Sequence, residues 1–227
     1  MDISIDNVTS KVKHLYQTLG LTVVRRAIGY GLESYEFTET LDDCDLRLVL
    51  LIKAQLEVKS IFMIGNAWGW GALCLATIFP FARIVVMDAE CEGADVAFGS
   101  EITHKIIDKY GLNIHLSRMK SPEQVHIAAE NRKFDLAIIN GRHGEMQIVE
   151  DFLAISPFLK PVCMVMLPML GKNSLSRGFS VIEMGARQLG FKFFDYASAA
   201  TVGGTSLVGR GININSCRAK ATTFKIL

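Results

Sequence analysis

From Ser60 onward, short apolar runs alternate with segments of helical periodicity, and this alternation constrains the fold more than any other feature. The runs with strand character are Ser60–Ile64, Arg83–Met87, Asn113–Leu116, Phe134–Ile139, Val162–Leu167, Phe191–Tyr196 and Thr205–Val208. Strands separated by helices are typical of a parallel sheet with helices on both faces. The run Val162–Leu167 is apolar throughout, as expected of a covered parallel strand. The sequence therefore predicts an α/β fold with a doubly wound, mostly parallel sheet.

Helical periodicity, glycine and proline define the segments between these runs. The predicted helices are Leu41–Glu57, Gly71–Phe79, Asp95–Tyr110, Glu145–Ile155 and Phe179–Leu189. Another helix is expected to open at Ser121-Pro122-Glu123, with serine as its cap and proline in its first turn. Residues 1–59 lack strand character and predict two or three helices. Because no composition shift marks a linker, we expect an N-terminal helical extension or lid at 1–58 and one domain at 59–227.

Composition narrows the range of partners. The 227 residues carry a formal net charge of +1, so no basic excess indicates nucleic acid, and we expect a small-molecule partner. The longest apolar runs, Leu46–Ala54 and Val162–Leu170, are shorter than the about 20 residues that a membrane helix needs. The five cysteines form no CxxC pair, and the polar N-terminus does not resemble a secretion signal. We therefore expect a reducing, cytoplasmic location and no membrane partner.

The turn Gly65–Gly71, with the sequence GNAWGWG, follows a predicted strand and opens a predicted helix. Its glycines permit a tight turn and a close approach of the backbone to a ligand. The helix N-terminus behind the turn favours a negatively charged group. An ordinary strand-to-helix turn has the same composition, so the turn alone leaves a structural role open.

Asp88 ends the next predicted strand, 23 residues after Gly65. An acid about 20 residues beyond a glycine turn can accept hydrogen bonds from both hydroxyls of a ribose. A helix-capping role is the alternative, and Glu90 and Glu92 are also within reach. Together, the turn and the acid favour a cofactor that carries a ribose.

Segments in the order IFMIGNAWGWG, RIVVMDAE and FDLAIINGRHGEMQIVEDFLAISPFLKPVCMVML resemble the class I S-adenosylmethionine-dependent methyltransferases, most closely the small-molecule O-methyltransferase branch. In that branch the fourth strand commonly ends in Ile-Asp-Gly-x-His, where this chain has Ile139-Asn140-Gly141-Arg142-His143. The resemblance spans about residues 55–210. It implies a Rossmann-like, seven-stranded sheet with six parallel strands and one antiparallel strand, with S-adenosyl-L-methionine bound across the carboxyl ends of the strands.

The resemblance also implies a role for individual residues. The cofactor-binding residues would be Gly65, Asn66, Ala67, Trp68, Gly69, Asp88, Ala89, Arg118, Met119 and Asn140. Trp70 and Arg142 would lie on the side of the substrate. His143 is the candidate general base for a hydroxyl acceptor, because it follows the fourth strand and a histidine titrates near neutral pH. For each tryptophan a packing role remains open, as does a structural role for His143 and a surface role for Arg142.

This chain departs from the family pattern at its acids. Met63 stands where the family usually has an acid before the first glycine, Arg118-Met119-Lys120 replaces the acid after the third strand, and Asn140 replaces the acid after the fourth. A hard cation needs several oxygen ligands, preferably charged ones. We therefore expect no metal site and a metal-independent reaction. Asp135, near the start of a predicted strand, is expected to cap or to face solvent.

The interpretation that follows is a methyltransferase that carries a methyl group from S-adenosyl-L-methionine to a small-molecule acceptor, at oxygen. One alternative is a catalytically silent binding or assembly protein on the same fold, which the missing acids motivate. A nicotinamide-dependent oxidoreductase is a weaker alternative, because the glycines are spaced GxxxGxG rather than GxGxxG. The apolar segment Leu19–Ile28 could pair subunits, so a homodimer is expected.

Overall fold

The computed structural model describes residues 3–24, 27–30, 33–36, 41–90, 94–141, 145–167, 176–196 and 205–211. The N-terminal elements are α1 (Ile5–Gln17), β1 (Leu21–Val24), β2 (Ala27–Tyr30), β3 (Glu33–Glu36) and α2 (Asp43–Lys53). They are followed by β4 (Ser60–Ile64), α3 (Trp70–Ile78), β5 (Arg83–Asp88), α4 (Ala94–Tyr110), β6 (Ile114–Arg118), α5 (Val125–Ala129), β7 (Phe134–Ile139), α6 (Glu145–Ile155), a 3₁₀ turn (Ser156–Phe158), β8 (Leu159–Leu167), α7 (Ser176–Gln188), β9 (Lys192–Tyr196) and β10 (Thr205–Arg210).

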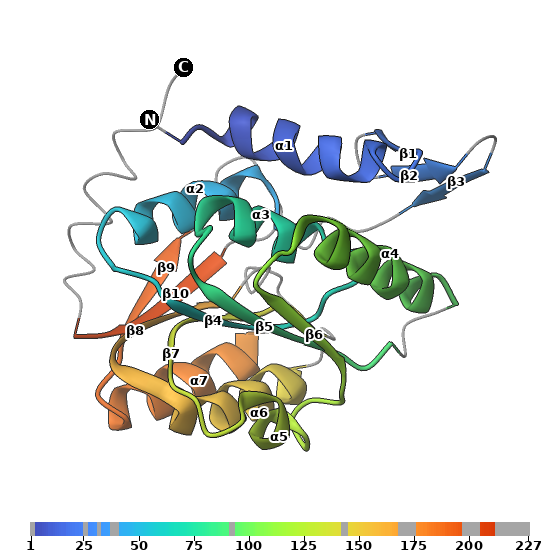
Figure 1. Cartoon of the computed structure of the whole chain (residues 1–227). Coiled ribbons are helices and arrows are strands. Elements are labelled where there is room, and N and C mark those ends of the chain that lie inside the picture. Colours follow the sequence, from blue (N-terminus) through green and yellow to red (C-terminus); the bar gives the residue numbers. More distant parts are fainter. Residues whose placement is uncertain are drawn as a thin grey trace.

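A large mixed sheet forms the middle layer of the molecule (Figure 1). Its strands are seven in number and follow the order β6-β5-β4-β7-β8-β10-β9. All neighbours from β6 to β8 are parallel, and β10 runs antiparallel to both β8 and β9. The prediction of a mostly parallel α/β sheet is confirmed. The order places β4, β5 and β7 side by side, so that their carboxyl ends meet near the centre of one edge of the sheet.

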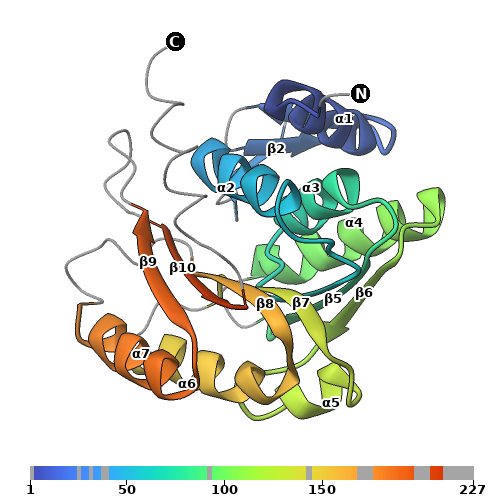
Figure 2. The same cartoon turned by 90° about the vertical axis from the view of Figure 1, so that its left-hand side faces the viewer.

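Helices cover both faces of this sheet, with α2, α3 and α4 on one side and α5, α6 and α7 on the other (Figures 1 and 2). Strand residues alternate between the two cores, as a period of two requires. In β4, Ile61 and Met63 pack with the core that includes α1 to α4, whereas Phe62 and Ile64 pack with the core that includes α5 to α7. Burial on both faces explains why the sequence of β4 is continuously apolar rather than alternating.

The N-terminal part differs from the expected set of helices. α1 and α2 are helical, but β1, β2 and β3 form a separate antiparallel sheet in the order β1-β2-β3. Each of these strands has four residues, which is too short for a strand period to stand out in the sequence. In the segment Leu19–Ile28, which was expected to pair subunits, Leu21 is buried, and Leu19 and Val23 pack against the core. The described apolar side chains of Leu19–Ile28 are thus covered by the chain itself, while Gly20 and Thr22 are exposed.

α5 begins later than predicted. Residues Ser121 to Gln124 form a turn, and the helix starts at Val125 with Gln124 at the capping position and no side-chain capping bond. The Ser121 hydroxyl is used elsewhere, because it donates a hydrogen bond to Asp151. The prediction that Ser121 caps this helix is therefore wrong.

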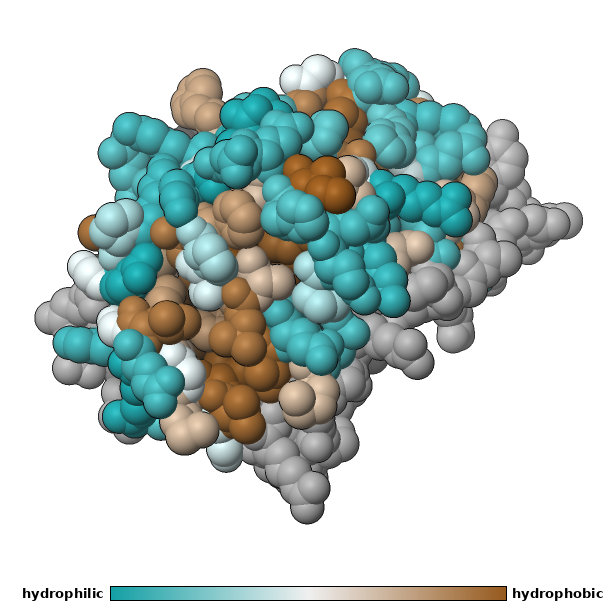
Figure 3. Space-filling view, turned by 90° about the horizontal axis from the view of Figure 1, so that it is seen from below, coloured by the Kyte–Doolittle hydropathy of each residue, from teal (hydrophilic) through white to brown (hydrophobic). Residues whose placement is uncertain are grey.

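Exposed apolar side chains occur on the face formed by α5, α6 and α7. They include Ile127, Met146, Leu153, Val181 and Met184. Figure 3 views the molecule from this side and shows apolar surface gathered there. Within the described residues, no helix combines the length and the hydropathy required to span a bilayer.

Candidate functional site

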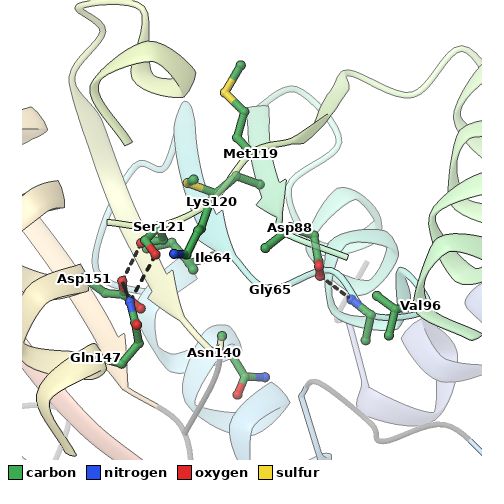
Figure 4. Close-up of a pocket in the computed structure, with 14 residues that line it drawn as sticks. Ile64, Gly65, Asp88, Val96, Met119, Lys120, Ser121, Asn140, Gln147 and Asp151 are labelled. Atoms are coloured by element: carbon green, nitrogen blue, oxygen red, sulfur yellow. Dashed lines mark hydrogen bonds between the residues drawn. The ribbon is translucent and has the colours of Figure 1, made fainter. Parts of the chain in front are cut away.

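A pocket opens where the sheet predicts it, at the carboxyl ends of β4, β5 and β7 (Figure 4). It is lined by Ile64, Gly65, Ala67, Met87, Asp88, Ala89, Val96, Met119, Lys120, Ser121, Asn140, Gly141, Gln147 and Asp151. Six of the residues assigned to the cofactor from the sequence resemblance line it: Gly65, Ala67, Asp88, Ala89, Met119 and Asn140.

Gly65 and Gly69 are required by the shape of the turn. Their φ angles are +92° and +85°, in the region that favours glycine. A Cβ atom on Gly65 would lie 2.2 Å from the backbone oxygen of Asn140, and one on Gly69 would lie 2.2 Å from Oγ1 of Thr103. The first contact shows that the turn is packed directly against the end of β7, which sets the depth of the pocket beside Gly65.

Asp88 braces this turn. Its Oδ2 accepts hydrogen bonds from the backbone N–H groups of Asn66 at 2.6 Å and Ala67 at 3.0 Å, and its Oδ1 accepts one from the N–H of Glu90 at 2.8 Å. The carboxylate thus joins the end of β5 to the loop after β4. The sequence identified Asp88 as a ligand-facing acid but did not reveal this second role, which depends on the pairing of β4 with β5.

Several residues assigned to the site from the sequence lie beside the pocket rather than in its wall. Trp68 is buried and meets Phe98 edge to face, with ring centroids 5.6 Å apart. Trp70 is buried in the same core. Asn66 is fully buried and donates from Nδ2 to Oγ1 of Thr103 at 3.2 Å. Hydrophobic burial of the two indoles favours packing over ligand contact.

Gly69 and Arg118 also lie outside the pocket wall. Gly69 is the N-cap of α3, where its left-handed backbone begins the helix. The side chain of Arg118 is 74% exposed and pairs through Nε with Oε2 of Glu90 at 3.2 Å. Gly69 thus serves to begin α3, and the side chain of Arg118 is in solvent rather than in the pocket.

α1 reaches the glycine turn through Tyr16. The fully buried Tyr16 hydroxyl donates a hydrogen bond of 2.7 Å to the backbone oxygen of Trp68. Burial, and secondarily the nearby Cys74, raises the pKa of Tyr16 well above its ordinary value. The hydroxyl therefore stays protonated and remains a donor, so α1 supports the turn from outside the sheet.

A polar cluster on the pocket wall opposite Asp88 was not predicted from the sequence. Asp151 is 1% exposed, and its Oδ1 accepts hydrogen bonds from the Ser121 hydroxyl and from Nε2 of Gln147, the latter at 2.9 Å. Gln147 Nε2 also donates to the backbone oxygen of Ser121 at 3.1 Å (Figure 4). Burial, opposed by these two donors to the carboxylate, raises the pKa of Asp151 above its ordinary value.

One sequence signal could have found this cluster. Gln147 and Asp151 stand four residues apart, hence on one face of α6. Their neighbours Ile148, Val149 and Phe152 are buried, so polar residues at this spacing interrupt an otherwise apolar face. A buried polar pair on a core-facing helix indicates a partner, which here is the loop after β6.

Asn140 follows β7 and has 9% of its surface exposed, at the floor of the pocket. Arg142 and His143, the expected substrate-binding and catalytic residues, lie outside the described residues. Within the residues that are described, no group of three or more His, Cys, Asp or Glu side chains is arranged to hold a metal ion.

Asp135 lies at the opposite, amino-terminal edge of the sheet and is buried rather than facing solvent. Its Oδ2 accepts hydrogen bonds of 2.9 Å from the N–H groups of Lys59 and Ser60, and from the Lys160 ammonium. The expectation that Asp135 faces solvent is wrong, because β7 lies between β4 and β8, whose first residues supply these donors. Asp135 fastens three strands and takes no part in the pocket.

Comparisons with solved structures identify the fold. The O-methyltransferase TomG from Streptomyces achromogenes, involved in tomaymycin synthesis and solved in complex with SAM, matches with a TM-score of 0.62 at 15% identity, over 92% of this chain and 91% of that chain. The O-methyltransferase from Bacillus cereus, solved with SAH, matches with a TM-score of 0.59 at 15% identity, over 91% of each chain. No protein-family model matches the sequence, nor does any curated protein. The fold is that of the class I methyltransferases, as the sequence resemblance predicted.

Proposed function

We propose that this protein transfers a methyl group from S-adenosyl-L-methionine to an oxygen atom of a small-molecule acceptor, without a metal ion. The observation that carries the proposal is the pocket at the ends of β4, β5 and β7, which combines the glycine turn with Asp88. The match to O-methyltransferases solved with SAM and SAH supports this use of the pocket.

The residues of the pocket fit this cofactor. Gly65 lines the pocket, and because it has no Cβ the glycine turn can pack directly on the backbone of Asn140, the residue after β7. Asp88 offers its carboxylate at the end of β5, where the hydroxyls of a ribose can donate hydrogen bonds to it. Its Oδ1 accepts one N–H, from Glu90, and can accept a further bond. Ala89 and Met119 add apolar wall on the same side.

The cofactor would supply an activated methyl group, so the work left to the protein is chiefly positioning. Holding an acceptor oxygen in line with the methyl carbon, about 3 Å away, accounts for much of the acceleration in such a reaction. We propose His143 as the base that takes the proton of the acceptor hydroxyl, and Arg142 as a contact for the acceptor. The N-terminal segment, residues 1–58, would cover the acceptor side. The Tyr16–Trp68 hydrogen bond supports a coupling between that segment and the glycine turn.

Titration calorimetry of the purified protein with S-adenosylmethionine, S-adenosylhomocysteine and NAD tests the cofactor. We expect the two sulfur compounds to bind in the micromolar range and NAD not to bind. Transfer of a labelled methyl group to members of a library of phenols and other alcohols would then identify the acceptor class. If neither sulfur compound binds at millimolar concentration, the proposal fails and a silent binding or assembly protein on this fold is favoured.

Variants of Asp88 and His143 distinguish a role in cofactor binding from a role in catalysis. Asp88→Ala is expected to weaken S-adenosylhomocysteine binding about tenfold to a hundredfold, since hydrogen bonds to a charged group are lost. His143→Ala is expected to slow turnover and leave cofactor affinity nearly unchanged. Because Asp88 also braces the turn, the 2′-deoxy analogue of the ligand serves as the control. The wild type should bind that analogue more weakly, and Asp88→Ala should not distinguish the two ligands. Equal affinities in the wild type would contradict the ribose role.

We propose further that the protein is a cytoplasmic homodimer that acts without nucleic acid. Cys74 and Cys163 are buried and in no disulfide among the described residues, which supports a reducing compartment. The exposed apolar side chains of α6 and α7 support subunit pairing better than Leu19–Ile28, whose described apolar side chains are covered.

A further inference from the structure

The two oxygens of the Asp151 carboxyl group differ in their hydrogen bonds. Oδ1 accepts both of its hydrogen bonds, from Ser121 and Gln147. Among the described residues, no donor is bonded to Oδ2. A Cβ built on Gly141 would lie 3.8 Å from Oδ2, an ordinary van der Waals distance, so Gly141 lies beside this oxygen. Asp151 lines the pocket, and an Oδ2 atom that has no donor among the described residues can receive one from a ligand.

Asp151 lies across the pocket from Asp88 (Figure 4). These two are the only carboxylates among the described residues of the pocket wall. If Asp88 holds the ribose, the base must lie toward one of the other walls, which include the apolar side chains of Ile64, Ala89 and Met119 as well as Lys120. A flat aromatic ring can pack against these apolar side chains, with its polar edge directed at Asp151.

The loop after β6 lines the pocket with Met119, Lys120 and Ser121, none of which is an acid. Its contribution is instead Ser121, whose hydroxyl holds Asp151 from α6 in place. The two donors on Oδ1 orient the carboxyl plane, and Gln147 is itself tied to the backbone of Ser121 at 3.1 Å. The acid thus comes from a helix and the loop positions it.

We propose that Oδ2 of Asp151 accepts a hydrogen bond from the exocyclic amino group of the cofactor's adenine, and so makes the pocket select amino-purines over oxo-purines. The proposal rests on the proposed function. Ser121 and Gln147 act as positioning residues. Burial raises the pKa of Asp151, and a ligand amine that donates to Oδ2 stabilises the ionised form that accepts this bond.

Calorimetric titration of S-adenosylhomocysteine and of its deaminated analogue S-inosylhomocysteine, which carries a carbonyl group in place of the amine, tests the assignment. We expect the wild type to prefer the adenosyl compound about tenfold to a hundredfold, because a hydrogen bond to a charged group is lost in the inosyl compound. There the carbonyl oxygen faces the carboxylate oxygen, and both are acceptors. In Asp151→Asn, the donors Ser121 and Gln147 retain the amide oxygen at the position of Oδ1, which turns the amide NH₂ toward the pocket. The preference should then disappear or reverse.

Glu150→Gln is the matched control, because it removes a carboxylate from the adjacent, exposed position of the same helix. Its ratio of affinities should equal that of the wild type. If Asp151→Asn does not fold, the wild-type ratio still decides, and Ser121→Ala should lower it by freeing the carboxyl to turn. Wild-type affinities within about threefold of each other, or an unchanged ratio in folded Asp151→Asn, would overturn the assignment. Failure of both compounds to bind the wild type would instead contradict the proposed function.

Discussion

At the scale of residues, two buried aspartates at opposite edges of the sheet differ in what surrounds them. Burial acts to raise the pKa of Asp135, but hydrogen bonds from Lys160, the Lys59 N–H and Ser60 outweigh it, so its pKa lies below the ordinary value. Burial prevails at Asp151, whose pKa is raised. The donors around Asp135 include an ammonium group, whereas those on Asp151 are neutral and the nearby Glu150 and Glu123 add to the rise of its pKa.

Asp135→Asn is expected to lower the free energy of unfolding at pH 7 by about 1–3 kcal/mol, because it breaks the pair with Lys160 and weakens the hydrogen bonds to β4. A carboxyl whose pKa is lowered by folding contributes stability above its unfolded pKa of about 3.9, and that contribution is lost as the pH falls toward the folded pKa. The gap between variant and wild type should therefore narrow below about pH 4. Urea titrations at pH 7 and pH 3 measure it.

The exposed Asp108 on α4 supplies the control, and Asp108→Asn should change stability by less than about 0.5 kcal/mol at either pH. A gap for Asp135→Asn that stays constant with pH would show that the charge of this carboxyl is not what fastens the strands.

Gly65→Ala combines two costs, a left-handed backbone and a collision of Cβ with the Asn140 oxygen. Gly111→Ala has the first cost alone, because its φ is +59° and no atom lies within 4 Å of a Cβ built there. We expect Gly111→Ala to cost about 1–2 kcal/mol and Gly65→Ala clearly more, with loss of cofactor binding. Thermal unfolding and calorimetry compare the pair, and equal stabilities would mean that the turn can move away from β7.

At the scale of elements, α1 is coupled to the glycine turn by one buried hydrogen bond. Tyr16→Phe removes the hydroxyl that donates to the Trp68 oxygen and should cost about 1 kcal/mol of stability. We also expect weaker binding of S-adenosylhomocysteine, because the turn loses a support. Tyr110→Phe is the control, since it removes an exposed hydrogen bond from the end of α4 to Thr18 Oγ1, at the end of α1, with a length of 2.8 Å. If both variants bind the ligand like the wild type, α1 does not influence the turn.

Predictability also differs between elements. The bounds of β4, β7 and α6 were predicted as observed, because each is a continuous apolar or periodic segment with clear ends. The strands β1 to β3 and the late start of α5 were not predicted. Their local sequences are short or carry capping signals, and contacts with other parts of the chain outweigh such signals.

At the scale of the whole molecule, the apolar surface of α6 and α7 bears on the proposed homodimer. Met146, Leu153 and Met184 are 61%, 51% and 60% exposed. Light scattering should give a mass of about twice the 25.1 kDa of one chain. Leu153→Glu with Met184→Glu should shift the mass toward the monomer if this surface is the interface. Phe81→Glu, which charges an apolar side chain that is 96% exposed outside these helices, should not. A wild-type mass of one chain would refute the homodimer.

The sequence by itself determined the layered α/β architecture, the glycine turn and the acid at the end of β5, because apolar period and turn composition are local properties. Only the tertiary structure decided that Asp88 braces the turn, that Trp68 and Trp70 are buried, and that Asp151 joins the pocket. The Ser121–Asp151 contact spans 30 residues, and the Asp88–Asn66 contact spans 22. Such contacts depend on which strands become neighbours, and strand order is set by the packing of the whole sheet rather than by any one segment.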